Sequence, residues 1–176
     1  MMKHSNLFVQ LNNGIEMPVL GYGLFKVPPQ EAERCTSDAL EVGYRLIDTA
    51  QAYDNEAGVG AAIAKSGIRR EDNFLVTKIW ITNAGEDKAA ASIDESLRKL
   101  QTDYVDLLLI HQAYGDVFGS WRAMEKAYHA GKVRAIGISN FSFGIVLFIF
   151  VILTIIAVGR RHQIKDDSEK DDGEQK

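Results

Sequence analysis

The feature that most constrains the fold of this chain is a short apolar run followed by an amphipathic stretch, repeated about every 25 to 32 residues. Four apolar runs, at 45–48, 73–78, 104–111 and 133–139, are rich in Val, Ile, Leu or Phe and do not alternate cleanly, as in strands buried on both faces. With the short run at 21–24 as the first strand, the repeat predicts right-handed βαβ units and a parallel sheet of five strands.

Helices are predicted between these strands because apolar residues recur there at intervals of three and four. The three expected apolar faces are Ala32, Cys35, Ala39 and Val42; Ala90, Ile93, Leu97 and Leu100; and Val117, Trp121, Met124 and Tyr128. A weaker helix, rich in Ala and Gly, is expected at 55–64. Ahead of the sheet, the turn residues at 12–14 separate the runs 7–11 and 15–20 and predict an N-terminal hairpin.

The composition narrows the classes of partner. The 176 residues, 46% of them apolar, suffice for one compact domain, and the net charge of -4 comes without a basic stripe in the first 140 residues. Nucleic acid is therefore not expected as a partner, and no metal site is expected either. The single cysteine, Cys35, cannot form an internal disulfide and is expected to be a buried packing residue.

The character of the chain changes at Phe143. No charged residue occurs from 135 to 159, and a helix over the last 20 of these residues spans roughly the 30 Å hydrocarbon core of a bilayer. The sequence predicts a transmembrane helix at 143–159, with a buried helix as the alternative, and a charged tail at 160–176. Because the N-terminus lacks a signal-peptide apolar region, we expect a C-terminal anchor with residues 1–142 in the cytoplasm.

Polar and ionisable side chains stand where the predicted strands end. Asp48 ends the second strand, Lys78 the third and His111 the fourth, and Ser139 with Asn140 ends the fifth. In parallel α/β proteins the working side chains gather at the carboxyl ends of the strands. Consecutive contributions around a ring suit a closed barrel better than an open sheet. The expected fold class is therefore α/β, a partial (β/α)8 barrel followed by one hydrophobic helix.

Two other nucleotide-binding patterns fail on inspection. The turn at 21–26 lacks the third glycine of GxGxxG, so a Rossmann phosphate cradle is not supported. Tyr128 and Lys132 match the Tyr-x-x-x-Lys pattern of another reductase superfamily, but they lie at a predicted helix end with no glycine fingerprint upstream. We interpret that match as chance.

Two long motifs carry a family resemblance. The run 43–50, followed by Tyr53, Asn55-Glu56 and Gly60, resembles the first signature of the aldo-keto reductases, and 131–141 resembles their second. The runs 75–78 and 109–111 stand where the lysine and histidine strands of that family belong. The resemblance extends from residue 7 to about residue 142.

The resemblance implies a catalytic tetrad of Asp48, Tyr53, Lys78 and His111. Carbonyl reduction by hydride creates a developing alkoxide, which needs a proton donor, and the resemblance gives this role to Tyr53. Lys78 is expected to lower the pKa of the Tyr53 phenol, and Asp48 to hold Lys78 charged and in place. His111 is expected to orient the substrate oxygen by donating a hydrogen bond.

The resemblance also implies NADPH as the cofactor and small aldehydes or ketones as substrates. Ser139 and Asn140 are expected to hold the nicotinamide carboxamide, while Gly23, Leu24, Phe25 and Asp48 pass close to the cofactor. Trp80 and His111 are expected to line the substrate pocket. Among subfamilies, sugar-ketone and diketogluconate-type reductases are the most similar.

The chain departs from the family after Phe141. A complete barrel of this type needs about 250 residues, and only five of its eight strands can be placed here. The glutamine, the stacking tyrosine and the basic 2′-phosphate cluster of the family cannot be found in the remaining sequence. We therefore expect an incomplete barrel at 1–142 with impaired NADPH binding.

Three interpretations of that departure stay open. The chain is a reductase that needs a second chain to complete its barrel, or an inactive membrane-tethered fragment that serves as an interaction module. The third possibility is a product of read-through, gene fusion or a wrong gene model. In that case the protein is expected to be cytoplasmic, because the membrane segment has no evolved role.

Overall fold

The computed structural model describes residues 8–141, and the folded unit ends at Asn140. The predicted membrane segment at 143–159 and the tail at 160–176 lie outside the described residues. Between residues 8 and 141, no helix is long and apolar enough to cross a membrane.

An N-terminal hairpin precedes the sheet, as predicted. Strand β1 (Phe8–Gln10) pairs antiparallel with β2 (Glu16–Pro18). The turn between them uses Gly14 at φ +85°, a conformation that favours glycine because a Cβ clashes there. The side chain of Asn13 donates a hydrogen bond to the backbone oxygen of Arg134 at 2.9 Å. The hairpin is thereby joined to the last strand connection of the described fold.

Five parallel strands form the main sheet, in the order of the chain. They are β3 (Gly21–Gly23), β4 (Leu46–Asp48), β5 (Phe74–Ile79), β6 (Leu107–Ile110) and β7 (Ile136–Ile138). The prediction of five parallel strands is confirmed. The apolar runs at 104–111 and 133–139 are strand only in their later parts, because a single bridge between Val105 and Val133 is all that pairs their beginnings.

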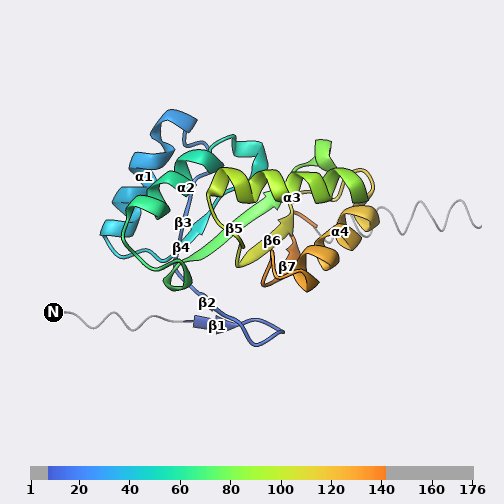
Figure 1. Cartoon of the computed structure of the whole chain (residues 1–176), viewed down its shortest axis with the longest axis horizontal. Helices are drawn as coiled ribbons and strands as arrows, with labels where there is room; N and C mark the ends of the chain where they lie inside the picture. Colours follow the sequence, from blue (N-terminus) through green and yellow to red (C-terminus); the bar gives the residue numbers. More distant parts are fainter. Residues whose placement is uncertain (1–7, 142–176) are drawn as a thin grey trace, which may run out of the picture. The chain divides into compact units, whose positions relative to one another are not determined.

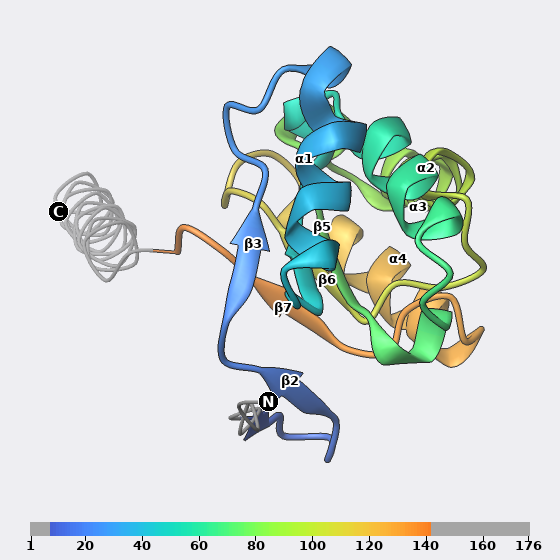
Figure 2. The same cartoon turned by 90° about the vertical axis from the view of Figure 1, so that its left-hand side faces the viewer.

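The strands are connected by helices that lie on one side of the sheet (Figures 1 and 2). They are α1 (Pro29–Glu41), α2 (Glu56–Lys65), α3 (Glu86–Leu100) and α4 (Val117–His129). Three short 3-10 helices complete the connections: η1 (Gln51–Tyr53), η2 (Arg70–Asp72) and η3 (Ile81–Asn83). Proline at the first position of α1 suits a helix start, where no intrahelical N–H partner is needed.

The core lies between the sheet and these helices. Its largest fully buried apolar side chains include Leu24, Ile47, Leu75, Leu108 and Met124. Each contributes about 1.5–3 kcal/mol relative to an exposed position. All six residues of β5 are buried, since this strand has a paired neighbour on both sides. The central strand is therefore the best-protected part of the sheet.

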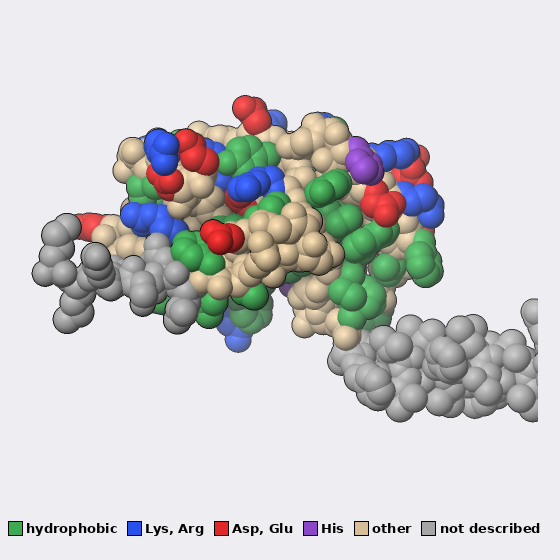
Figure 3. Space-filling view, turned by 90° about the horizontal axis from the view of Figure 1, so that it is seen from below, with side chains coloured by type: hydrophobic (Ala, Val, Ile, Leu, Met, Phe, Trp, Pro, Cys, Tyr) green, Lys and Arg blue, Asp and Glu red, His purple; other side chains and the backbone are tan. Residues whose placement is uncertain are grey.

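In α3 the predicted core residues Ile93, Leu97 and Leu100 are buried, but the faces of α1 and α4 differ from prediction by about one position. In α1, Cys35 is half-buried rather than buried, and Val42 is 71% exposed. In α4, Tyr128 is 39% exposed, while the positions that face the core are Gly119, Ser120, Ala123, Met124 and Ala127. Small residues take the buried positions because the helices pack closely on their neighbours. Larger apolar side chains lie at the rim, and Figure 3 shows apolar groups at the surface among charged ones.

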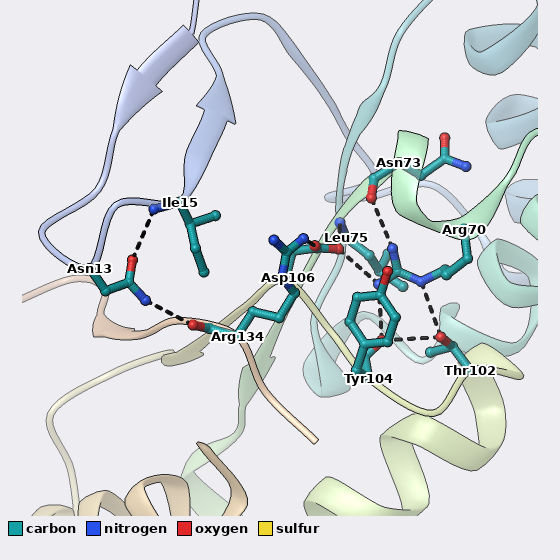
Figure 4. Close-up of polar contacts among 9 residues, drawn as sticks. All are labelled: Asn13, Ile15, Arg70, Asn73, Leu75, Thr102, Tyr104, Asp106 and Arg134. Carbon is teal, nitrogen blue, oxygen red and sulfur yellow. Dashed lines mark hydrogen bonds and ion pairs between the residues drawn. The ribbon is translucent and has the colours of Figure 1, made fainter. Parts of the chain in front are cut away.

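An ionic cluster closes the end of the sheet where the strands begin. We call Asp106, Arg70 and Arg134 the Asp106 clamp (Figure 4). The Asp106 carboxylate is buried, forms an ion pair with Arg70 at 2.8 Å, and accepts hydrogen bonds from Arg134 at 2.7 Å and from the backbone N–H of Leu75 at 2.9 Å. The ring of Tyr104 lies 4.1 Å from the Arg70 guanidinium. The clamp joins η2 to the starts of β5, β6 and β7.

Candidate active site

A partly buried ion pair lies at the opposite end of the sheet, where the strands finish. Asp48 is the last residue of β4, and Lys78 lies near the end of β5. The Lys78 ammonium donates to Asp48 Oδ1 at 2.5 Å and to the backbone oxygen of Thr49 at 2.9 Å. Because both strands run parallel and in register, the two side chains share one face of the sheet. Asp48 and Lys78 are thus bonded to each other, the contact that a role for Asp48 in holding Lys78 requires.

Tyr53 reaches the same place from η1, which follows β4. Its ring lies 5.2 Å from the Lys78 ammonium and 5.5 Å from the His111 ring, which it meets edge-on. Burial raises the pKa of the Tyr53 phenol, and the negative charge of Asp48 raises it further. The net shift of this pKa is therefore upward, whereas the resemblance implied a lowered value. The ammonium of Lys78 is bonded to Asp48 and Thr49 instead of to the phenol.

His111 follows β6 and is 8% exposed. Its backbone N–H donates to the oxygen of Ile79, which continues the pairing of β5 with β6. Burial lowers the pKa of the imidazole, and the positive charge of Lys78 lowers it further. The ring is thus neutral at pH 7 and has one N–H to donate. Its Nδ1 atom is buried without a hydrogen-bond partner among residues 8–141, which is unusual away from a ligand site.

Trp80 forms a wall of this cluster. It directly follows β5, and its ring centroid lies 5.1 Å from that of His111. Three rings from three strand ends, Tyr53, His111 and Trp80, are therefore adjacent. Trp80, which the resemblance gave to the substrate pocket, thus lies beside His111.

Ser139 and Asn140 follow β7 and complete the row of strand ends. The Asn140 amide donates to the backbone oxygen of His111 at 2.9 Å and to the Ser139 hydroxyl at 3.1 Å. Asn140 adopts a left-handed conformation at φ +57°, which directs its side chain back toward His111. The structure thus brings both residues beside the catalytic cluster.

The predicted cofactor loop leaves β3 on the other side of the cluster. Gly23 pairs with Asp48 across the sheet, and the N–H of Leu24 donates to the Asp48 backbone oxygen. Leu24 is fully buried, and its backbone oxygen accepts from the Val27 N–H and the Asn55 amide, so this residue offers no free polar group to a ligand. The Phe25 ring is 65% exposed and lies 5.3 Å from the Tyr53 ring.

Sequence reasoning gave no role to two amide side chains beside Tyr53. Gln51 bonds to Trp80, Asn83 and α3, and Asn55 bonds to Thr49 and to the loop after β3. Asn55 was part of the recognised motif, while Gln51 was passed over. The sequence feature that could have indicated a role for both is their position, two residues before and two residues after Tyr53.

A groove of the described fold lies away from this cluster. It measures about 760 Å³ and is lined by residues of α2, α3 and the clamp end, among them Ile63, Arg70 and Tyr104. It shares no residue with the catalytic cluster. We assign the candidate active site to the cluster of converging side chains, because the volume of a groove does not show that it holds reactive groups. Within residues 8–141 no group of three or more metal-ligating side chains occurs.

Comparison with known proteins agrees with this geometry. The Aldo/keto reductase family matches residues 19–149. The glyoxal reductase of Bacillus subtilis (strain 168) is 48% identical over 135 residues, which are 76% of this chain and 49% of that protein. The chain spans about half the length of the curated relatives it matches.

Solved structures give the same result. An aldo/keto reductase from Brucella melitensis matches with a TM-score of 0.78 and 47% identity, over 81% of this chain and 55% of that one. The Bombyx mori aldo-keto reductase in complex with NADP matches with a TM-score of 0.69 and 33% identity, over 75% of this chain and 50% of that one. The family match, the parallel sheet and the converging strand ends together show that this chain belongs to the aldo/keto reductase family.

Proposed function

We propose that this chain carries the catalytic half of an NADPH-dependent reductase that converts aldehydes and ketones to alcohols. The observation that carries the proposal is the convergence of Tyr53, Lys78 and His111 at the carboxyl ends of adjacent strands, with Asp48 bonded to Lys78. In the family, NADPH supplies the hydride. The chain's own residues must then bind the carbonyl oxygen and give it a proton.

Tyr53 is the proposed proton donor. Because burial raises the pKa of its phenol, the proton is present across the neutral range. The phenolate left after transfer would be stabilised by the Lys78 ammonium, which lies 5.2 Å from the ring. Neutral His111 would donate a hydrogen bond to the carbonyl oxygen and so orient it toward Tyr53.

Ser139 and Asn140 are the proposed contacts of the nicotinamide carboxamide. The Ser139 hydroxyl can donate, and the Asn140 side-chain oxygen has no partner among the described residues, so a donor and an acceptor are both available. Gly23 to Phe25 would pass beside the ring, and Asp48 would border it. The donor set therefore fits an amide group.

An assay of NADPH oxidation tests the proposal. Glyoxal is the first substrate to try, because it is named in the glyoxal reductase relative. The 176-residue chain would be assayed alone and as a chimera completed with the C-terminal half of that relative. We expect Tyr53→Phe to reduce turnover of the chimera by at least about 100-fold while sparing NADPH binding.

Tyr128→Phe is the matched control. Like Tyr53→Phe, it removes one tyrosine hydroxyl. Tyr128, however, is exposed on α4 and lies outside the cluster. We expect its turnover to be unchanged. Loss of activity in this variant, with Tyr53→Phe active, would support the Tyr-x-x-x-Lys interpretation and refute ours.

We expect the 176-residue chain alone to bind NADPH weakly. The described residues include side chains that can bind the nicotinamide end of the cofactor. The basic cluster that binds the 2′-phosphate in the family is not found in this sequence. Quenching of intrinsic fluorescence by NADPH measures the affinity. Micromolar binding by the chain alone would contradict this expectation.

The hydrophobic segment at 143–159 is proposed to anchor the protein in a membrane, with residues 1–142 on the cytoplasmic face. Its support is the uncharged stretch from 135 to 159. Protease added to the cytoplasmic side of sealed membranes should digest the reductase part and leave a small C-terminal fragment. A chain that stays in the supernatant after membranes are pelleted would refute the anchor.

A further inference from the structure

Gln51 is the first residue of η1, the 3-10 turn that ends at Tyr53, and its side chain uses all of its hydrogen-bonding groups. Its amide nitrogen donates to the backbone oxygen of Ser92 at 3.2 Å and to the Ser96 hydroxyl at 3.1 Å. Its amide oxygen accepts from the backbone N–H of Trp80 and from the Asn83 amide, both at 2.9 Å. Four bonds to protein partners saturate a glutamine amide.

These bonds connect three elements around the candidate site. Gln51 belongs to the turn that carries Tyr53, Trp80 begins the segment that leads into η3, and Ser92 and Ser96 lie on α3. The N–H of Trp80 is bonded to Gln51, while its ring lies 5.1 Å from the His111 ring. The backbone of the aromatic wall is therefore held by the same turn that holds Tyr53.

We propose that Gln51 positions the Trp80 ring relative to the Tyr53 hydroxyl and thereby sets the size of carbonyl substrate that the site accepts. The inference about substrate size rests on the proposed reductase function, while the inference about Trp80 stands on its own. Gln51 is a positioning residue, because it acts through Trp80 and Asn83 rather than on the substrate.

The chemistry explains why an amide suits this position. A backbone N–H and an amide N–H require an acceptor, whereas the Ser92 carbonyl on α3 requires a donor, and a single amide supplies both at fixed separation. Methionine has the same length but offers neither group. Glutamate keeps the acceptor for Trp80 and Asn83, and Ser96 can turn its hydroxyl to donate to it.

Trp80 fluorescence tests the proposal without any need for activity. The chain has two tryptophans, and Trp121→Phe leaves Trp80 as the sole emitter. In that background we expect Gln51→Met to red-shift the emission and to raise acrylamide quenching by about twofold, because the wall opens to solvent. Gln51→Glu should keep the parental spectrum. An unchanged spectrum in Gln51→Met would overturn the proposal, whether or not the chain reduces carbonyls.

A kinetic comparison in the completed chimera then tests the substrate-size inference. We expect Gln51→Met to raise KM for glyoxal at least about threefold, with little change in kcat. The ratio of kcat/KM for glyoxal to kcat/KM for an aromatic aldehyde should therefore fall. Gln51→Glu should restore that ratio. If kcat fell while KM and the ratio stayed unchanged, Gln51 would act on the proton donor and the substrate-size inference would be wrong. Absence of activity in the parent would refute the proposed function and leave the fluorescence result decisive for Gln51.

Discussion

The two ends of the sheet each hold a carboxylate paired with basic side chains, but the pairs are built differently. At the end where strands begin, Asp106 has both oxygens bonded by Arg70, Arg134 and the N–H of Leu75. At the end where strands finish, Asp48 is paired through Oδ1 with Lys78 alone, and its side chain is 34% exposed. Among the described residues no partner is bonded to Asp48 Oδ2.

This difference separates a structural site from a functional one. A fully bonded carboxylate has no capacity left for a ligand, so the Asp106 clamp can only stabilise the fold. At the Asp48 end, His111 Nδ1 and the acceptor oxygen of Asn140 have no partner among residues 8–141, whereas at the clamp end the unpartnered atom is Asn73 Oδ1, outside the Asp106 carboxylate. Unsatisfied polar groups cost stability, and they concentrate where a protein binds other molecules. Substitutions at the two ends should therefore change different measurements.

The largest effect is expected from Asp106→Ala. The substitution removes the acceptor of Arg134 and of the Leu75 N–H and the counter-ion of Arg70, and we expect the free energy of unfolding to fall by about 3 kcal/mol. Urea unfolding of the 176-residue chain measures this loss. Lys78→Met is the control at the other end, where we expect a loss below about 1 kcal/mol because the Asp48 carboxylate that remains is partly hydrated. Equal losses would remove the distinction between the two ends.

Lys78→Met should show the reverse pattern. The unfolding free energy should change by less than about 1 kcal/mol, because methionine fills the same space and Asp48 stays in contact with water. Turnover of the completed chimera should fall at least about 100-fold, because the phenolate of Tyr53 loses its positive neighbour. A variant that unfolds easily yet keeps its turnover would show that Lys78 is a structural residue.

Arg134→Met sharpens the comparison within the clamp. Its side chain is 43% exposed, and Arg70 still bonds to Asp106 after the substitution. Solvent screens an ion pair of this exposure, so we expect a loss of about 1 kcal/mol, well below that of Asp106→Ala. Thermal or urea unfolding provides the measurement. A loss as large as that of Asp106→Ala would mean that both arginines are required together.

The smallest effect is expected at Glu56, a buried carboxyl whose bonded partner is the Thr77 hydroxyl rather than a cation. Burial raises the pKa of Glu56 above its ordinary value of 4.5, so the folded chain holds this proton more tightly than the unfolded one. The stability that this group contributes is fully present below pH 4.5, the ordinary pKa, and is lost as the pH rises through the pKa of the folded chain.

Glu56→Gln cannot ionise and should remove that part of the pH dependence. We expect the variant to gain stability relative to the parent as pH rises from about 4.5 to 8. Unfolding curves across this range, with the exposed Glu125→Gln as control, make the comparison. A parent whose stability rises with pH relative to the variant would show that Glu56 is ionised and paired in the folded chain.

The order of strands and the catalytic row could be predicted from the sequence because both follow from local pattern. Each apolar run marks a strand. Because the strands are parallel, their carboxyl ends lie together, and this brings Asp48, Lys78 and His111 to the same end of the sheet. The buried faces of the helices were predicted less accurately. A hydrophobic pattern picks out large apolar residues, whereas closely packed helices bury small ones. Gly60 shows this: a Cβ there would lie 2.5 Å from the backbone of Leu100 on α3.

The pKa of Tyr53 and the role of Gln51 were also beyond the sequence. The upward shift comes first from burial of the phenol and then from the charge of Asp48, and motif spacing predicts neither. The bonds of Gln51 join segments about 30 and 41 to 45 residues apart. Only the folded arrangement brings these groups into contact.

The hydrogen bond from Asn13 to Arg134 has a consequence for the order of folding. It closes a loop of 121 residues, which costs on the order of 4 kcal/mol of chain entropy if made first. The hairpin strands have three residues each, and all of β1 is exposed, so they offer little burial to offset that cost. The hairpin must therefore dock on a sheet that already exists, and it is the described segment whose amide protons we expect to exchange with solvent first.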